Sequence, residues 1–229
     1  MAGNAPDQRV RCAFIGDESL TVQCAAMALA HDLDVAVVAS SSPPVLQAAR
    51  DLGMVTLDTR LAGSLADALR AHKFDVLLSV AYQHILPDDV LGQARTCINF
   101  HDGPLPEYGG LNVTTWAIAN GEARHAITWH LMTSQVDRGD VVTAEEFDIG
   151  ADDTAFSLNA RCYEAGLATF PAVAVALAKG SLRTSPQPDR SRRTYRRRQR
   201  PLILVDPRGD LRAIGWRWGA TWPSPGGNT

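Results

Sequence analysis

The sequence predicts an α/β protein with a Rossmann-like, largely parallel sheet that carries helices on both faces. Two observations lead to this prediction. Short apolar segments alternate with stretches of helical periodicity through the first half of the chain. The apolar segments are almost continuous, which is typical of parallel strands that are buried on both faces. Apolar residues make up 45% of the 229 residues, an ordinary value for a soluble globular protein.

Four strands and three helices are predicted in the first part of the chain. The strands are expected at residues 11–16, 34–39, 55–57 and 75–80. The helices are expected at residues 20–30, 45–52 and 61–73. Right-handed crossovers between such strands build a Rossmann-like core. Ligands of such sheets bind beyond the carboxyl ends of the strands.

The following part of the chain adds three strands, a short helix and a long helix. The strands are expected at residues 96–98, 125–132 and 141–147, and the helices at residues 113–120 and 154–179. Asp152, Asp153 and Thr154 suit the start of the long helix as capping residues, and Gly180 suits its end. Residues 1–183 are therefore predicted to form one domain.

Residues 184–229 differ in composition from the rest of the chain. They are rich in arginine, proline, glycine and tryptophan, and they contain one short apolar run at residues 202–205. A segment of this length is too short to fold alone. We therefore expect an Arg/Pro-rich extension whose apolar part packs on the core from Leu202 onward. Its tryptophans are expected to dock on the body of the protein, and no nucleic-acid partner is expected.

The charge of the chain is unevenly distributed. The net charge is −3, yet residues 184–200 hold seven arginines and one aspartate, a local charge of +6. The remainder therefore carries −9. An arginine run is by default a solvated face, but on an acidic body it could also contact an acidic partner. Both alternatives apply to the run from Arg190 to Arg200.

Asn99 and His101 are the leading candidates for chemistry. They follow the apolar run at residues 96–98 and are spaced two apart, so alternation along a strand puts both on one face. An amide donor and a titratable base then point to one place at the carboxyl end of a strand. The loop at residues 102–112 contains two prolines and three glycines. Such a loop has few conformations at proline and permits close approach at glycine, as a substrate-facing loop requires.

The first strand-to-helix turn does not look like a phosphate-binding loop. It contains one glycine and two acids, Gly16, Asp17 and Glu18, in place of the glycine pattern of dinucleotide-binding turns. The two carboxylates would repel a phosphate. A nicotinamide cofactor is therefore not expected, and no P-loop occurs in the chain.

No metal site is predicted. The four cysteines show no Cys-x-x-Cys spacing, so we expect reduced, mostly buried thiols. The histidines other than His101 show no ligand spacing, and His125 and His130 face opposite sides of a strand. Asp102 points away from His101 on an extended segment, so we expect it to be a structural hydrogen-bond acceptor.

The sequence also predicts a cytoplasmic location with no membrane partner. No apolar run approaches the length needed to cross a bilayer. Residues 1–10 lack the apolar segment of a secretory signal. The scattered cysteines agree with a reducing compartment.

Two separated elements resemble those of the formyltransferases that use 10-formyltetrahydrofolate. In that family an Asn-x-His pattern precedes a proline-containing loop that ends in glycine, and an Asp-x-Gly turn follows further along the chain. The corresponding elements here are residues 99–112 and residues 134–142. The resemblance covers roughly residues 10–180. It implies a formyltransferase catalytic domain at residues 1–183, with 10-formyltetrahydrofolate as co-substrate and without a metal.

The resemblance implies catalytic roles for Asn99, His101 and Asp137. Formyl transfer passes through a tetrahedral intermediate, whose developing oxyanion could accept a hydrogen bond from the amide of Asn99. His101 could stabilise the oxyanion as an imidazolium and help protonate the leaving folate nitrogen. Asp137 could orient His101, favour its charged form or relay a proton through water.

The same resemblance places the folate pocket on two segments. Family members hold the pterin with the segment after the fourth strand and with the turn that carries the aspartate. The corresponding cofactor-binding residues are His84, Ile85, Leu86, Pro87, Val136, Asp137 and Gly139. The apolar side chains of Ile85, Leu86, Leu91 and Ile98 would suit a flat ring, and core positions would explain them equally well.

Residues 14–20, 101–112 and 128–132 are most similar to formylation domains of natural-product assembly lines of the nonribosomal-peptide type. Residues 195–201 resemble the start of the segment that follows those domains. Such enzymes, which serve antibiotic biosynthesis, formylate an amine on an aminoacyl or aminoaryl group held by a carrier protein. Carrier proteins are acidic, so an acyl or peptidyl carrier protein becomes the candidate partner of Arg190 to Arg200.

Other acceptors remain open. Nucleotide-sugar amine formyltransferases share a similar loop, and a 10-formyltetrahydrofolate hydrolase would use water in place of the amine. A non-enzymatic binding module would predict a degraded triad, whereas Asn99, His101 and Asp137 are all present. The initiator-tRNA formyltransferases add a larger C-terminal domain than residues 184–229 could form, so initiator tRNA is not expected as the acceptor.

Overall fold

The computed structural model describes residues 9–196, 198–199, 203–205 and 211–213. Within these residues the main sheet has seven strands in the order β3-β2-β1-β4-β5-β7-β8. Its parallel strands are β1 (Arg11–Ile15), β2 (Asp34–Ser40), β3 (Thr56–Asp58), β4 (Val76–Val80) and β5 (Thr96–His101). Two antiparallel strands, β7 (Arg124–Leu131) and β8 (Val141–Asp148), extend the sheet beyond β5. The predicted α/β fold with a largely parallel sheet is confirmed.

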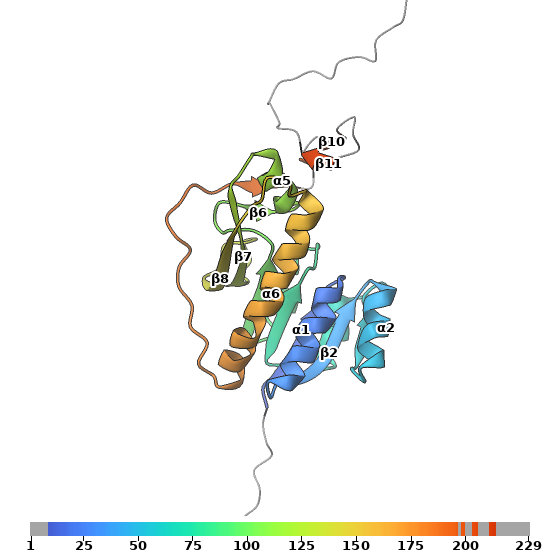
Figure 1. Cartoon of the computed structure of the whole chain (residues 1–229). Helices are drawn as coiled ribbons and strands as arrows, with labels where there is room; N and C mark the ends of the chain where they lie inside the picture. The colour runs from blue at the N-terminus through green and yellow to red at the C-terminus, as the bar shows by residue number, and fades with distance from the viewer. Residues whose placement is uncertain (1–8, 197, 200–202, 206–210, 214–229) are drawn as a thin grey trace, which may run out of the picture.

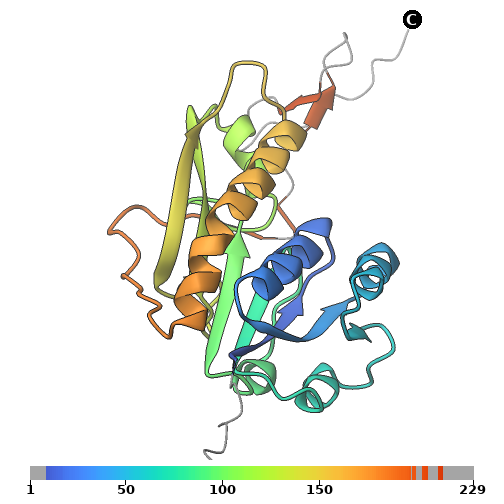
Figure 2. The same cartoon turned by 60° about the horizontal axis from the view of Figure 1, so that its bottom comes forward.

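Helices cover both faces of this sheet (Figures 1 and 2). One face carries α1 (Ser19–Ala30), α2 (Pro43–Asp51) and α6 (Ala155–Ala178), and the other carries α3 (Leu65–Arg70) and α4 (Asp88–Leu91). Because successive strand residues point to opposite faces, Phe14 packs in the first layer and Ile15 in the second. A third, smaller core forms around α5 (Val113–Ala119).

The structure differs from the sequence expectation in its short elements. Helix α3 begins after Ser64, whose hydroxyl accepts from the N–H of Asp67, and it ends three residues before the predicted residue 73. Helix α4 and four two- or three-residue strands were not predicted, because elements this short leave no periodicity in the sequence. These strands are β6 (Gly109–Gly110), β9 (Thr194–Tyr195), β10 (Ile203–Val205) and β11 (Leu211–Ala213).

The long helix α6 begins and ends where its capping residues predict. The hydroxyl of Thr154 accepts from the N–H of Ser157, and the Ser157 hydroxyl accepts from the N–H of Thr154, which forms a reciprocal cap. The helix ends before Gly180, whose φ is +61°. All four cysteines are free and buried, as expected. Within the described part of the chain, no helix combines the length and apolar character that crossing a bilayer requires.

Residues 184–196, called the strap below, leave the end of α6 and return along the edge strand β8 (Figure 1). Ser185 bridges to Val141 at the start of β8 through two backbone hydrogen bonds of 2.7 and 2.9 Å. Strand β9 of the strap then pairs in parallel with β6, in the loop that follows β5. The division at residue 183 stays a prediction. Leu202 and residues 206–210 and 214–229 lie outside the described residues, and so does the predicted packing of that part of the extension.

Candidate active site

A cavity of about 820 Å³ lies at the carboxyl ends of the parallel strands. The chain leaves β1 toward β2 on one side and leaves β4 toward β5 on the other, so a crevice opens between the two connections. The cavity is lined by the turn after β1, the segment after β4, the end of β5 and the turn before β8. Asn99, His101 and Asp137 all line it, so the tertiary structure brings the three predicted catalytic residues together.

The imidazole of His101 has a fixed orientation. His101 is only 5% exposed, and its Nε2 lies 2.5 Å from the backbone oxygen of Tyr108. Because a carbonyl can only accept, Nε2 carries the hydrogen and Nδ1 is the nitrogen that gains or loses a proton. A Cβ at Gly103 would lie 3.1 Å from Nε2 of His101 and 2.8 Å from the oxygen of Tyr108. Glycine at this position therefore makes room for the histidine and its acceptor.

His130 belongs to the site, although no motif or ligand spacing in the sequence singles it out. Strands β5 and β7 pair so that His130 lies opposite Asn99, and Nε2 of His130 is 3.2 Å from Nδ2 of Asn99. Nδ1 of His130 donates to the backbone oxygen of Leu131 at 2.8 Å, which leaves Nε2 as an acceptor in the neutral ring. Asn99 therefore gives one amide hydrogen to His130 and keeps the second for the cavity. Only the strand register reveals this contact.

Asp137 is held in an uncommon backbone conformation. Its φ is +54°, and its side chain is 11% exposed. Oδ2 accepts from the N–H of Gly110 at 2.7 Å, and Oδ1 lies 3.6 Å from Nε2 of His130. Burial by itself would raise the pKa of Asp137, but the charge of His101, the neighbouring imidazole of His130 and the hydrogen bond from the N–H of Gly110 lower it well below its ordinary value. Asp137 is therefore an ionised carboxylate that contacts His130 directly, while Tyr108 orients His101.

The expectation that Asp102 points away from His101 is wrong. Oδ1 of Asp102 lies 4.0 Å from Nδ1 of His101, and the residue lines the cavity. The chain bends immediately after His101, so strand alternation no longer applies at position 102. The backbone oxygen of Asp102 does serve as an acceptor, for Nε2 of His125 at 2.7 Å. His125 therefore supports the loop from the opposite face of β7 and does not line the cavity.

One wall of the cavity is apolar and open. Ile85 is 77% exposed and Val136 is 48% exposed, and both line the cavity together with Leu86, Leu91 and Met132. Exposed apolar side chains around a slot fit a flat aromatic ring such as a pterin. His84, which the family resemblance assigns to the folate pocket, also lines the cavity.

Three residues considered for the folate pocket do not line this cavity. Pro87 caps α4, where its oxygen accepts from the N–H of Val90. Gly139 directs its oxygen toward the strap, and a Cβ there would lie 1.8 Å from the oxygen of Leu131. Ile98 is fully buried in the core beneath α1 and α6, because it alternates with Asn99 along β5.

The wall of the cavity beyond His101 is polar, and no motif in the sequence identifies its residues. Glu18, Asp102, Asn159 and Tyr163 contribute two carboxylates, an amide and a phenol to it. Glu18 is the N-cap residue of α1, yet its side chain makes no capping hydrogen bond, and no partner is found for it within the described part of the chain. Burial raises the pKa of Tyr163, and the charges of Glu18 and Asp102 raise it further, so the phenol remains a hydrogen-bond donor.

The arginines of the strap are largely engaged by the protein itself. Arg190 pairs with Glu107 at 3.0 Å, and Arg193 lies 3.6 Å from Glu122. Arg192 donates to the backbone oxygen of Asp137 at 3.2 Å. Arg196 lines the cavity and is exposed, as is Arg198. Positions 197 and 200 lie outside the described residues.

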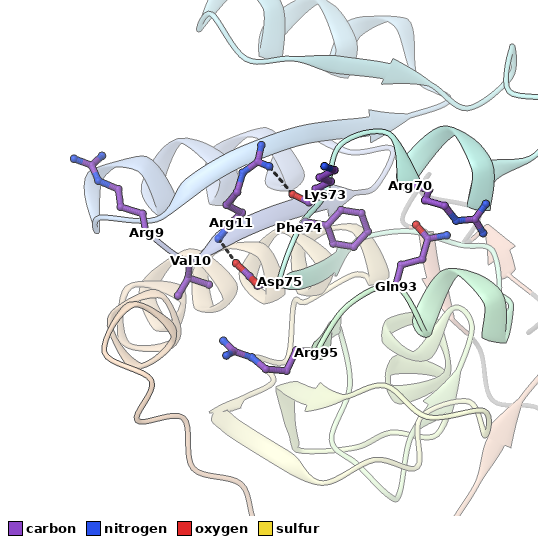
Figure 3. Close-up of a pocket in the computed structure, with 9 residues that line it drawn as sticks. All are labelled: Arg9, Val10, Arg11, Arg70, Lys73, Phe74, Asp75, Gln93 and Arg95. Carbon is purple, nitrogen blue, oxygen red and sulfur yellow. Dashed lines mark hydrogen bonds between the residues drawn. The ribbon is translucent and has the colours of Figure 1, made fainter. Parts of the chain in front are cut away.

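A second cavity, of about 630 Å³, lies at the amino ends of the strands (Figure 3). Its lining includes Arg9, Arg11, Arg70, Lys73 and Arg95, and none of the candidate catalytic residues. Among the described residues, no group of three or more His, Cys, Asp or Glu side chains is arranged to hold a metal ion. The cavity at the carboxyl ends is therefore the candidate active site, because the candidate catalytic residues converge there and not at the amino ends.

Comparison with known proteins gives one family match. The family model described as "Formyl transferase" matches residues 23–174. The chain is 37% identical to the methionyl-tRNA formyltransferase of Synechococcus sp. (strain JA-2-3B'a(2-13)) over 129 residues, which are 56% of this chain and 40% of that protein. It is 32% identical to the methionyl-tRNA formyltransferase of Delftia acidovorans over 169 residues, 73% of this chain and 52% of the relative. The chain thus spans about half the length of the curated relatives it matches.

Solved structures share the fold. A glycinamide ribonucleotide transformylase from Symbiobacterium toebii superposes with a TM-score of 0.71 at 22% identity, covering 82% of this chain and 97% of that chain. The sugar 3N-formyl transferase WlaRD, solved with dTDP and 5-N-formyl-THF, has a TM-score of 0.71 at 18% identity, covering 86% of this chain and 73% of that chain. At these identities the superpositions establish the fold.

Proposed function

Because the chain belongs to the formyl transferase family, we propose that it transfers a formyl group from 10-formyltetrahydrofolate to the amine of a carrier-bound aminoacyl or aminoaryl group in natural-product biosynthesis. The observation that supports the chemistry is the convergence of Asn99, His101, His130 and Asp137 on one cavity. The apolar wall around Ile85 and Val136 supports a folate as donor.

The oxyanion is stabilised by Asn99 and His101 in this proposal. The acceptor amine attacks the formyl carbon, a carbon–nitrogen bond forms, and negative charge develops on the formyl oxygen. Asn99 donates the amide hydrogen that His130 leaves free. A donor of this kind typically contributes about 10²–10³ in rate. Protonated Nδ1 of His101, near the Asp102 carboxylate, supplies a second donor.

Proton movement completes the transfer. The attacking nitrogen loses one proton, and the leaving N10 of the folate gains one as its bond to the formyl carbon breaks. Ionised Asp137 accepts a proton through a water molecule, and Nδ1 of His101 delivers one to N10. Asp137 returns its proton to His101 through solvent, which restores both groups. General acid–base help of this kind is worth roughly 10²–10⁴ in rate.

The polar wall favours an acceptor without phosphate close to its amine. Asp102 lies beside His101 and Glu18 lies near Tyr163 on the same wall. Their negative charges attract an ammonium group, which releases a proton to solvent before it attacks, and they repel a pyrophosphate. In a carrier-bound aminoacyl group the phosphate of the prosthetic arm is remote from the amine. In a nucleotide sugar the pyrophosphate is attached to the sugar ring itself. These charges therefore favour the carrier-bound amine.

A nucleotide-sugar amine is the second candidate. Arg196 lines the cavity and could bind a pyrophosphate, since guanidinium groups suit phosphate oxygens. The sugar N-formyltransferase WlaRD also shares the fold. The two candidates predict opposite roles for Glu18 and Arg196.

Docking of an acidic carrier is proposed for the exposed end of the arginine run. Arg190, Arg192 and Arg193 have partners within the protein, so docking is assigned to the exposed Arg196 and Arg198. Steering between exposed charges is screened over about 8 Å at physiological salt. Turnover of a carrier-bound substrate should therefore fall as salt rises, and turnover of a small free amine should not.

The proposal is tested by donor turnover with three acceptors: an aminoacyl carrier protein, the matching free amino acid and a nucleotide aminosugar. Release of tetrahydrofolate and the mass of the formylated product are measured together, with His101→Ala as the inactive control. We expect the carrier-bound amine to show the highest kcat/KM and Glu18→Gln to lower it. Arg196→Ser with Arg198→Ser should raise KM for the carrier substrate only.

Each other result has its own meaning. A highest kcat/KM for the nucleotide aminosugar, lost in Arg196→Ser, would replace the carrier proposal by the second candidate. Equal tetrahydrofolate release with and without amine would assign a hydrolase. No consumption of the donor in any arm would reject formyl transfer for this chain.

A further inference from the structure

We propose that Gln187 and Arg192 of the strap are positioning residues that hold the Asp137 turn in its reactive geometry. The inference rests on the proposed function, because it concerns the carboxylate that the mechanism uses. Both residues lie outside the region that the family model matches, which ends at residue 174. Neither side chain lines the cavity, so both would act through Asp137.

Gln187 and Arg192 bind the backbone of the turn that carries Asp137, and they also bind each other. Nε2 of Gln187 donates to the backbone oxygens of Asp137 and Gly139, each at 2.9 Å. Arg192 donates from Nη1 to the same oxygen of Asp137 at 3.2 Å, and from Nη2 to Oε1 of Gln187 at 2.7 Å. The guanidinium thus orients the amide, and both side chains bind the backbone of Asp137. Arg192 is partly buried, and burial together with the charge of Arg138 lowers its pKa.

The turn needs such support. Asp137 has a φ of +54°, a region that costs a non-glycine residue free energy unless the surroundings hold it. Its own side chain contributes one backbone contact, the bond from the N–H of Gly110 at 2.7 Å. The direction of the carboxylate toward His130 therefore depends on how its backbone is fixed.

The strap also fixes the opposite partner of the carboxylate. The N–H of Gly109 donates to the oxygen of Arg193 at 3.1 Å, and the N–H of Leu111 donates to the oxygen of Tyr195 at 2.9 Å. The ring of Tyr195 stacks on Trp116, with centroids 4.6 Å apart and an angle of 18°. One segment therefore holds both the Asp137 turn and the loop whose amide binds its carboxylate. The relative position of the two is set by the strap.

The test combines activity with a direct titration of Asp137. Gln187→Met and Arg192→Met keep the side-chain bulk and remove the hydrogen bonds. Arg183→Met is the matched control, because Arg183 is an exposed arginine that precedes the strap and lines no part of the cavity. Carbon-13 NMR of labelled aspartate follows the Asp137 carboxyl, and steady-state kinetics give kcat and KM for the folate donor.

We expect both strap variants to lower kcat by about 10- to 100-fold with little change in KM, since a misplacement near 1 Å can cost about 10² in rate. The Asp137 titration should move upward toward the ordinary value near 3.9, as the carboxylate loses its aligned donors. Arg192→Lys keeps one donor and should recover part of both effects. Arg183→Met should match the wild type in both measurements.

The two readouts separate failure of this inference from failure of the proposed function. If the wild type transfers no formyl group, the NMR titration still decides whether the strap positions Asp137. If the wild type is active and both strap variants keep its kcat and its Asp137 titration, the positioning role is refuted. A loss of kcat without any shift in the titration would also refute it, since the effect would not pass through the carboxylate.

Discussion

The two ends of the parallel sheet carry cavities of similar size but different construction. In the cavity at the carboxyl ends, of about 820 Å³, the candidate catalytic side chains are buried or partly buried, and hydrogen bonds fix their direction. The cavity at the amino ends, of about 630 Å³, is lined mainly by exposed cations. The guanidinium groups of Arg9 and Arg70 lie at opposite ends of that row, so the cations do not converge on one point (Figure 3).

The cations at the amino ends are also partly neutralised. Arg11 pairs with Asp34 at 2.9 Å and donates to the backbone oxygen of Lys73 at 2.7 Å, and Arg70 pairs with Asp67. Charges in contact with water interact weakly, whereas the buried groups around His101 interact in a medium of low polarity. The comparison teaches that a cavity becomes a reactive site when buried polar groups converge on one point. A high local density of charge does not by itself make a cavity reactive.

The largest effect should come from His101→Ala. Removing the proton donor should lower kcat by about 10²–10⁴ while the affinity for folate stays nearly unchanged, because the residue acts mainly on the transition state. Single-turnover kinetics and calorimetry with a folate analogue measure the two quantities. Arg95→Ala, which changes the other cavity, is the control and should keep full activity. An equal decrease in kcat in both variants would contradict the assignment of the active site to the cavity at the carboxyl ends.

Gly110→Ala should cause the next largest effect. Gly110 has a φ of +94°, and a Cβ there would lie 2.0 Å from the oxygen of Tyr195. Backbone strain and the clash together should lower the free energy of unfolding by roughly 2–5 kcal/mol. Gly121→Ala is the matched control, because Gly121 has a φ of +67° but open space at its Cβ, so strain of about 1–2 kcal/mol remains. Chemical denaturation checks the difference, and equal losses would contradict the close approach of the strap.

Asp137 should make a smaller contribution to stability that depends on pH. Its pKa is lower in the folded protein than in the unfolded chain, so the contribution is complete above the unfolded value near 3.9 and is lost as the pH falls through the folded value. Asp137→Asn should therefore reduce the free energy of unfolding by about 1.5–3 kcal/mol at neutral pH, the worth of hydrogen bonds to a charged group. Denaturation at a series of pH values should show this difference shrinking below about pH 4. If the difference in stability between the wild type and Asp137→Asn grew as the pH fell, the pKa of Asp137 would be raised by folding, contrary to the direction assigned here.

The smallest effect should come from Arg70→Ala at the amino ends. The side chains of Arg70 and Asp67 are 62% and 70% exposed, and such surface pairs contribute about 0.2–1 kcal/mol. The expected change in the melting temperature is correspondingly small, and kcat should not change. Calorimetry at low and high salt checks both the size and the screening of the pair. A decrease in the free energy of unfolding above about 2 kcal/mol would contradict this prediction. It would show that the pair contributes more than its solvent exposure indicates.

Much of the fold could be predicted because its signals are local. The apolar segments of β1, β2, β4 and β5 reflect burial on both faces, and the cap at Thr154 marks the start of α6. The two-residue strands β6 and β9 could not be predicted, since pairing with a distant segment, and no pattern of their own, makes them strands. Asp102 was mispredicted because a bend ends the alternation at His101.

The sequence by itself determined the sheet and the common face of Asn99 and His101, because the two-residue period of a strand is a local property. Only the tertiary structure decided that His130 lies opposite Asn99, since strand register depends on the packing of whole faces. It also decided that Gln187, fifty positions away along the chain, holds the backbone of Asp137. A hydrogen bond between residues so far apart in the chain cannot be read from local periodicity. It forms only because the folding of the intervening residues brings the two side by side.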